Sequence, residues 1–235
     1  MSMEILSING TALTGIYVDA SLSYNKPARK VQTFEIPGRN GGLVIDDGTW
    51  GNLVITYPCY TKNVATFEAI INQLGALSGY QKIECSNDTT HFRMGVPIIP
   101  ATPTIKRRNT EAWFELAFNC KPQRFLNTGE TVSSKTASGS ISNPTAFDSQ
   151  PLLRIYGTGP ITVNGTKITV GAHGESFVDV DCEMMDCFNG TTNLNKYITF
   201  SNNDFPSLKP GSNTITFNSG TSITKIEITP RWWEL

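Results

Sequence analysis

Few side chains in this sequence are of the types that catalyse reactions. The chain has two histidines, His91 and His173, and no H-E-x-x-H, G-x-S-x-G, Walker A or dinucleotide-binding motif. A Ser-His-Asp triad could still be assembled from distant residues, because such triads are defined by geometry. The scarcity of histidine among abundant serine and threonine nevertheless argues against catalysis. We therefore predict that the protein is not an enzyme and has no catalytic residues.

One acidic pattern has the spacing of a cation site. Asp179, Asp181 and Glu183 alternate with apolar residues, so in a strand the three carboxylates would share one face. Neighbouring carboxylates are oxygen ligands suited to Ca²⁺, but the segment lacks the glycine and terminal glutamate of an EF-hand loop. The other interpretation is the solvated outer face of a half-buried strand. We favour that interpretation and predict no metal and no cofactor.

The cysteine pattern also indicates no metal site. The five cysteines are odd in number, widely spaced and without a C-x-x-C pair. Zinc sites and disulfide frameworks require closely matched or even sets. We expect reduced, mostly buried thiols.

A basic cluster, Lys106, Arg107 and Arg108, lies between Pro103 and an alternating strand that starts at Trp113. It is either a solvated turn or a loop that projects into a phosphate-lined space. The whole chain has 19 basic and 20 acidic side chains and a net charge of −1. Such a balance excludes broad coating of nucleic acid, which requires a strongly basic face.

Two tryptophans are candidate contacts for other subunits. Alternation places Phe114 and Phe118 on the buried face of their strand and Trp113 on the other, and counting by twos along the last strand places Trp233 outward. Tryptophan is a frequent interface anchor. Outward aromatics can equally be covered by a second sheet or a loop, so both interpretations remain open.

These residues are expected to lie on a mainly β scaffold of two β-sandwich domains. The spacing of apolar residues predicts one helix, from Val64 to Leu77, with Asn63 as its N-cap. Asn164-Gly165 predicts a two-residue hairpin turn. The small, polar composition around residues 131–149 predicts a linker between a domain at 1–130 and a domain at 150–235.

Neither targeting nor membrane insertion is expected. The first ten residues lack a basic segment followed by an apolar core, so we predict no signal peptide and folding in a cytoplasm. No stretch approaches the roughly 18 apolar residues of a membrane-spanning helix.

An ordered set of segments resembles the siphophage distal tail protein family. The set begins with Phe34–Gly42 and Trp50–Ile55, continues with the strand that ends at Phe118–Pro122, and includes Ser149–Gly159, Phe205–Asn213 and Ile226–Trp233. Each segment is weakly specific. Together they span nearly the whole chain in the order found in that family.

The resemblance implies an N-terminal belt domain related to tail-tube proteins, with one helix, and an outer galectin-like or carbohydrate-module-like sandwich. It implies a homohexameric ring in the virion, assembled in the bacterial cytoplasm, that joins the tail-tube protein to the tail-associated tip protein. In some phages such a ring is also the hub for receptor-binding proteins. DNA would pass through the lumen without specific binding, and the Lys106–Arg108 loop is a candidate to line it.

Arg39 is a further candidate for contacts between subunits. Arg39 follows Gly38 on a tight turn, where its planar guanidinium could pair across subunits or stay solvated. We name Arg39, Trp113 and Trp233 as candidate interface residues.

The alternative function is a carbohydrate-binding module that contributes to host attachment.

Overall fold

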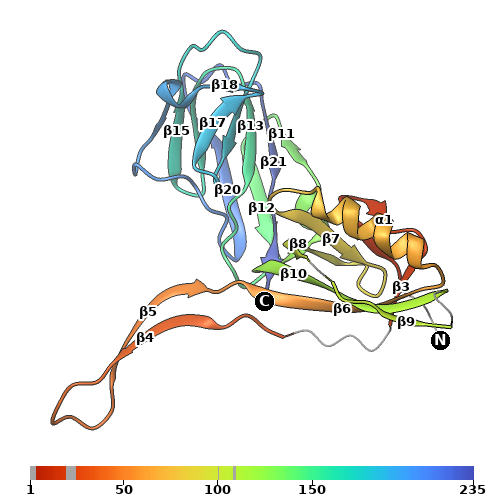
Figure 1. Cartoon of the computed structure of the whole chain (residues 1–235). Helices are drawn as coiled ribbons and strands as arrows, with labels where there is room; N and C mark the ends of the chain where they lie inside the picture. Colours follow the sequence, from red (N-terminus) through yellow and green to blue (C-terminus); the bar gives the residue numbers. More distant parts are fainter. Residues whose placement is uncertain (1–3, 20–24, 100, 108–109) are drawn as a thin grey trace. The chain divides into compact units, whose positions relative to one another are not determined.

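The computed structural model describes residues 4–19, 25–99, 101–107 and 110–235, which form two compact units (Figure 1). The described residues up to Arg124, together with Leu235, form the first unit, and Phe125–Glu234 form the second. The expected mainly β architecture is confirmed. The described part of the chain contains one α-helix, and it contains no helix long and apolar enough to cross a membrane.

The first unit is built on one sheet. Its strands are β1 (Leu6–Ile8), β2 (Thr11–Ala12), β3 (Ile16–Val18), β6 (Leu53–Thr61), β7 (Gln81–Cys85), β8 (His91–Ile98), β9 (Thr104–Lys106) and β10 (Glu111–Leu126). They lie in the order β2-β1-β7-β8-β10-β6-β3, and β9 also pairs with β10. The long central pair β6–β10 is antiparallel and places Trp113 opposite Tyr60.

The only α-helix among the described residues covers one face of this sheet. Helix α1 (Val64–Gly75) begins where the Asn63 side chain accepts a hydrogen bond from the Ala65 backbone, as the sequence predicts. Its apolar face is buried, and the ring of Phe67 lies 4.7 Å from that of Phe114 on β10. The opposite face of β10 carries Trp113, which is 43% exposed. Residues that alternate along β10 therefore divide between a core under the helix and an open face.

Two strands of the first unit stand apart from its sheet. β4 (Arg29–Phe34) and β5 (Leu43–Trp50) pair with each other and form their own two-stranded sheet. Figure 1 shows this hairpin extending away from the sheet, and every residue of β4 is exposed. An isolated two-stranded hairpin is marginally stable in water.

The second unit is a β-sandwich. Its strands are β11 (Ser133–Lys135), β12 (Gly139–Asn143), β13 (Leu152–Tyr156), β14 (Gly159–Val163), β15 (Thr166–Val170), β16 (Val178–Asp181), β17 (Asp186–Asn189), β18 (Thr192–Asn193), β19 (Ile198–Phe200), β20 (Gly211–Phe217) and β21 (Lys225–Thr229), with 3₁₀ turns η1 (Asn127–Glu130) and η2 (Asn195–Tyr197). The last strand of the chain, β22 (Trp233–Glu234), pairs with β10 and belongs to neither sheet of the sandwich. One sheet has the order β11-β21-β13-β16-β17-β18 and the other β12-β20-β14-β15-β19. The valines, isoleucines and leucines of both sheets meet in one core.

Local turn chemistry follows the sequence. β14 and β15 join through Asn164 and Gly165, whose φ angles are 46° and 88°. Both residues tolerate the left-handed conformation that a two-residue hairpin turn requires. The predicted hairpin is confirmed.

The segment expected to be a linker, residues 131–149, contains two strands. β11 pairs with β21, and β12 pairs with β20. Both are edge strands of their sheets, and four of the five β12 residues are small or polar. An edge strand needs few apolar side chains because its outer side is not covered, which explains why composition alone suggests a loop here.

The turn from β16 to β17 exposes two methionines and strains one of them. Met184 and Met185 are 69% and 66% exposed, and Met185 has a φ of 53°. A left-handed backbone is unfavourable for an ordinary side chain and much less so for asparagine. We expect Met185→Asn to raise the free energy of unfolding by about 0.5–1 kcal/mol in urea denaturation. Met184→Asn, in the same turn without a positive φ, is the matched control and should give no gain.

Candidate assembly surfaces

The two histidines, the side chains best suited to catalysis, make local structural contacts. His91 contacts Asp88 at 3.1 Å in the first unit, and Arg124 donates to the same carboxylate at 2.6 Å. Partial burial would raise the pKa of Asp88, but hydrogen bonds from Arg124 and His91 outweigh it and hold the pKa well below its usual range. His173, in the second unit, accepts a hydrogen bond from the Glu175 backbone at 3.2 Å. Each histidine thus stabilises a turn in its own unit.

The acidic pattern on β16 differs from the solvated face expected from the sequence. Asp179 and Asp181 are 5% and 4% exposed. Arg154 binds both oxygens of Asp179 at 2.7 and 2.8 Å, and Arg231 binds both oxygens of Asp181 at 2.8 and 2.7 Å. The arginines lie 25 and 50 residues away in sequence, so alternation along β16 could not reveal them.

Neither the acidic residues nor the cysteines form a metal site in the described part of the chain, where no group of three or more His, Cys, Asp and Glu side chains is suitably placed. All five cysteines are free and buried. Burial raises the pKa of the Cys59 thiol to about 12 and that of Cys120 to about 11. Such thiols are protonated at neutral pH and chemically inert.

The basic cluster leads into the strand that carries Trp113. The Lys106 ammonium lies 5.5 Å from the centre of the Trp113 ring, and Arg107 pairs with Glu111 at 3.0 Å. Arg108 lies outside the described residues. Two of the three cluster residues therefore contact their own strand pair; whether they face a lumen remains a prediction.

The two candidate tryptophans have different surroundings. Trp113 packs against Tyr60 with ring centres 4.5 Å apart, and much of its surface remains exposed. Trp233 stacks on Phe147 at 4.4 Å and donates its indole N–H to the Asp148 carbonyl at 2.9 Å. Trp233 is therefore engaged within its own unit, whereas Trp113 has a free surface.

Trp113 borders a groove on the open face of the first unit's sheet. The groove has a volume of about 540 Å³. Its lining includes Pro58 on β6, Ile98 and Ala101 beside the connection from β8 to β9, and Trp113 and Glu115 on β10. We call this surface the Trp113 groove.

The β4–β5 hairpin presents a second apolar surface. Its register pairs Phe34 with Leu43 and Gln32 with Ile45, so these four side chains share one face. Phe34, Leu43 and Ile45 are 49%, 46% and 51% exposed. We call this the bulky face of the hairpin. This surface was not predicted from the sequence, although apolar residues alternate at 34 and 36 and at 43 and 45.

Arg39 lies in the turn that joins β4 to β5. The turn is closed by a hydrogen bond from the Arg39 backbone N–H to the Ile36 carbonyl at 3.1 Å, and Gly38 has a φ of 82°. No ion pair of Arg39 occurs within the described residues. Its guanidinium is thus carried at the tip of the hairpin, as expected from the sequence, and its role as an interface residue remains a prediction.

Comparison with known proteins shows which proteins have a similar sequence or fold. Residues 164–232 match the family model for the C-terminal domain of the siphovirus-type tail component. The resemblance to the siphophage distal tail family is confirmed. The crystal structure of phage SPP1 Dit, described as a hub of the adsorption apparatus in phages that infect Gram-positive bacteria, superposes with a TM-score of 0.68 at 13% identity and covers 97% of this chain and 98% of its own.

Two further solved structures share this fold. A chain of the phage P2 baseplate in its activated conformation with Ca has a TM-score of 0.55 at 10% identity, over 97% of this chain and 98% of that chain. A chain of the same baseplate with Sr has a TM-score of 0.51 at 11% identity, over 96% and 97%. No curated protein matches the chain in sequence. The likeness to the three solved chains therefore rests on fold.

Proposed function

We propose that this chain is a structural subunit of a phage tail tip, and that six copies close into a ring. The ring would join the tail tube to the tip apparatus, with receptor-binding proteins as further partners, and DNA would leave through its lumen. The observation that carries the proposal is the β4–β5 hairpin, whose apolar residues are left exposed by the described part of the chain. An exposed apolar surface of this kind is typical of a protein interface.

The arrangement of charged and polar groups agrees with a mechanical role. The histidines, the paired aspartates and the buried thiols all serve local structure, and we assign none of them to a reaction. The chain thus contributes shape and rigid sheets. We place it in the virion, after assembly in the host cytoplasm.

The carbohydrate-binding alternative has weaker support. Tyr156 and Phe177 are partly exposed and form an aromatic pair in the second unit, with ring centres 5.7 Å apart. Lys225 lies 4.1 Å from the Tyr156 ring centre, and Arg154 lies 4.2 Å from that of Phe177. These cations occupy ring surface on which a sugar would stack. We therefore favour the assembly role for the protein.

The proposal is tested by measuring the mass of the purified chain. We expect light scattering coupled to gel filtration to give six times the subunit mass of 25.7 kDa, and negative-stain images to show a ring with a central hole. Closed rings arise when a head-to-tail contact repeats through a rotation that closes. A constant subunit mass up to high micromolar concentration would contradict the ring.

A further inference from the structure

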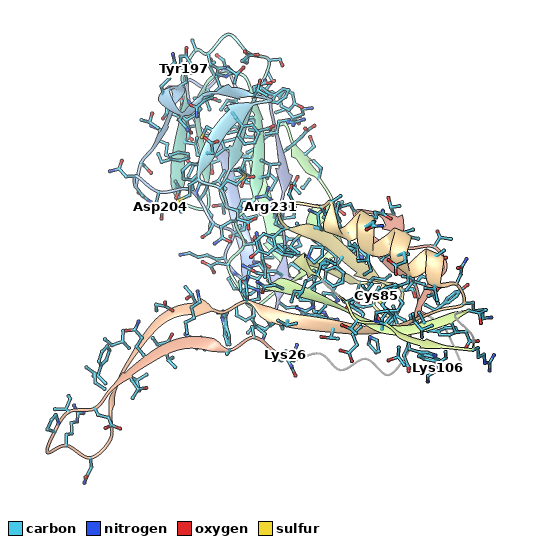
Figure 2. All side chains as sticks on the ribbon, in the orientation of Figure 1. Lys26, Cys85, Lys106, Tyr197, Asp204 and Arg231 are labelled. Carbon is cyan, nitrogen blue, oxygen red and sulfur yellow. The ribbon has the colours of Figure 1, made fainter. Side chains whose placement is uncertain are left out.

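The bulky face of the hairpin and the Trp113 groove are two separate apolar surfaces of the same unit. β5 leads directly into β6, so the hairpin adjoins the start of β6 at Leu53, whereas the groove lies farther along that strand at Pro58. Figure 2 shows Lys106, which marks the β9 side of the groove, at the end of the sheet far from the hairpin. The hairpin of one chain therefore does not cover the groove of that chain.

We propose that the hairpin of one copy lies in the Trp113 groove of a second copy, with Arg39 of the first paired to Glu115 of the second. The proposal rests on the proposed ring and names the contact that would build it. Phe34, Leu43 and Ile45 would be covered by Ile98, Ala101 and Trp113. The occupant is a second copy because both surfaces belong to one chain and neither is covered by the residues of that chain that the structure describes.

Charge complementarity supports this pairing. Glu115 is exposed in the wall of the groove, and Arg39 is exposed at the tip of the hairpin. Neither side chain forms an ion pair within the described residues, in contrast to Arg29, Arg107 and Glu111, which all do. Within this part of the chain, each apolar surface thus carries one unpaired charge, a guanidinium on the hairpin and a carboxylate in the groove. Pairing of these two charges would fix the register in which the surfaces meet.

The geometry of the contact also produces a ring. Hairpin and groove are different surfaces, so the contact is head-to-tail and leaves one free hairpin and one free groove on every open chain of subunits. The free ends disappear only when the last hairpin reaches the first groove. A closed ring is therefore the form in which every bulky face is covered.

The contact is tested by exchanging the two charges in the full chain. We expect Arg39→Glu and Glu115→Arg each to weaken assembly at least tenfold, roughly the effect of one unfavourable charge contact, as measured by sedimentation velocity across a concentration series. The double variant should recover most of the wild-type assembly, because the pair is restored with opposite polarity. Circular dichroism should show all three variants folded, since both residues are exposed.

A second pair of variants tests the apolar part of the contact. Phe34→Ser on the bulky face should weaken assembly, whereas Val44→Ser, on the opposite face of the same hairpin and 58% exposed, is the matched control and should have a much smaller effect. If wild type forms rings that neither charge reversal weakens, this contact is excluded and the ring stands. If both single variants lose assembly and the double variant does not recover it, the Arg39–Glu115 pairing is also overturned.

Discussion

Removing the hairpin should convert the assembling subunit into a folded monomer. The register places Arg29 opposite Trp50, so residues 31–48 can be replaced by Asn-Gly, which closes a two-residue turn between the remaining strand ends. Partial burial of the three large apolar side chains of the bulky face in an interface is worth about 3 kcal/mol, which corresponds to about a hundredfold in the association constant. Sedimentation velocity should therefore show only the monomer at concentrations where wild type assembles.

The same variant should keep its fold. The removed residues are exposed, and the core of the first unit is formed by other strands and by α1. We expect the midpoint of thermal unfolding to stay within a few degrees of that of the wild-type monomer, because surface changes away from packed features cost little. A shortened chain that still forms the wild-type assembly would show that the hairpin is not an assembly element. A chain that fails to fold would show that the hairpin stabilises the subunit itself.

Most of the fold could be predicted from local sequence patterns. The alternation along β10, the cap at Asn63 and the Asn164-Gly165 turn each depend on a few adjacent residues, and the structure contains all three as expected. The helix ends at Gly75, where Ala76 caps it, although apolar spacing continues to Leu77. These features are predictable because backbone geometry and side-chain periodicity act over short distances.

The surfaces could not be predicted to the same extent, because they depend on partners distant in sequence. Asp181 is a solvated carboxylate by its position in the strand pattern and becomes buried only because Arg231 lies beside it. The bulky face of the hairpin was not predicted for the opposite reason: its apolar residues have the pattern of a core strand, but no core among the described residues covers them. Local pattern predicts that a side chain will be buried somewhere, not which element covers it.

Breaking the ion pair between Asp181 and Arg231 should destabilise the second unit strongly. Asp181 is 4% exposed and accepts both hydrogen bonds of the Arg231 fork and two from the backbone of Glu183 and Met184. Asp181→Ala leaves a partly buried guanidinium without its counter-ion and two backbone donors without an acceptor. We expect a loss of about 3–5 kcal/mol in the free energy of unfolding, measured by urea denaturation at pH 7.

Glu183→Ala is the matched control, because Glu183 lies 3.7 Å from the same guanidinium but its side chain is 37% exposed. A solvent-screened pair of this kind should cost less than about 1 kcal/mol. Equal losses in the two variants would show that burial of Asp181 does not set the strength of its pairing.

The Asp181 pair also gives the unit a defined sensitivity to acid. Burial raises the pKa of Asp181, but the Arg231 fork and the backbone N–H groups lower it more, so the folded-state pKa lies below its ordinary value of 3.8. The resulting stability is present above pH 3.8 and is lost as the pH falls through the folded-state pKa. The stability gap between wild type and Asp181→Ala should therefore narrow progressively as the pH is lowered below 3.8 in urea denaturation. A gap that stays constant over this range would mean that the carboxylate contributes through packing and not through its charge.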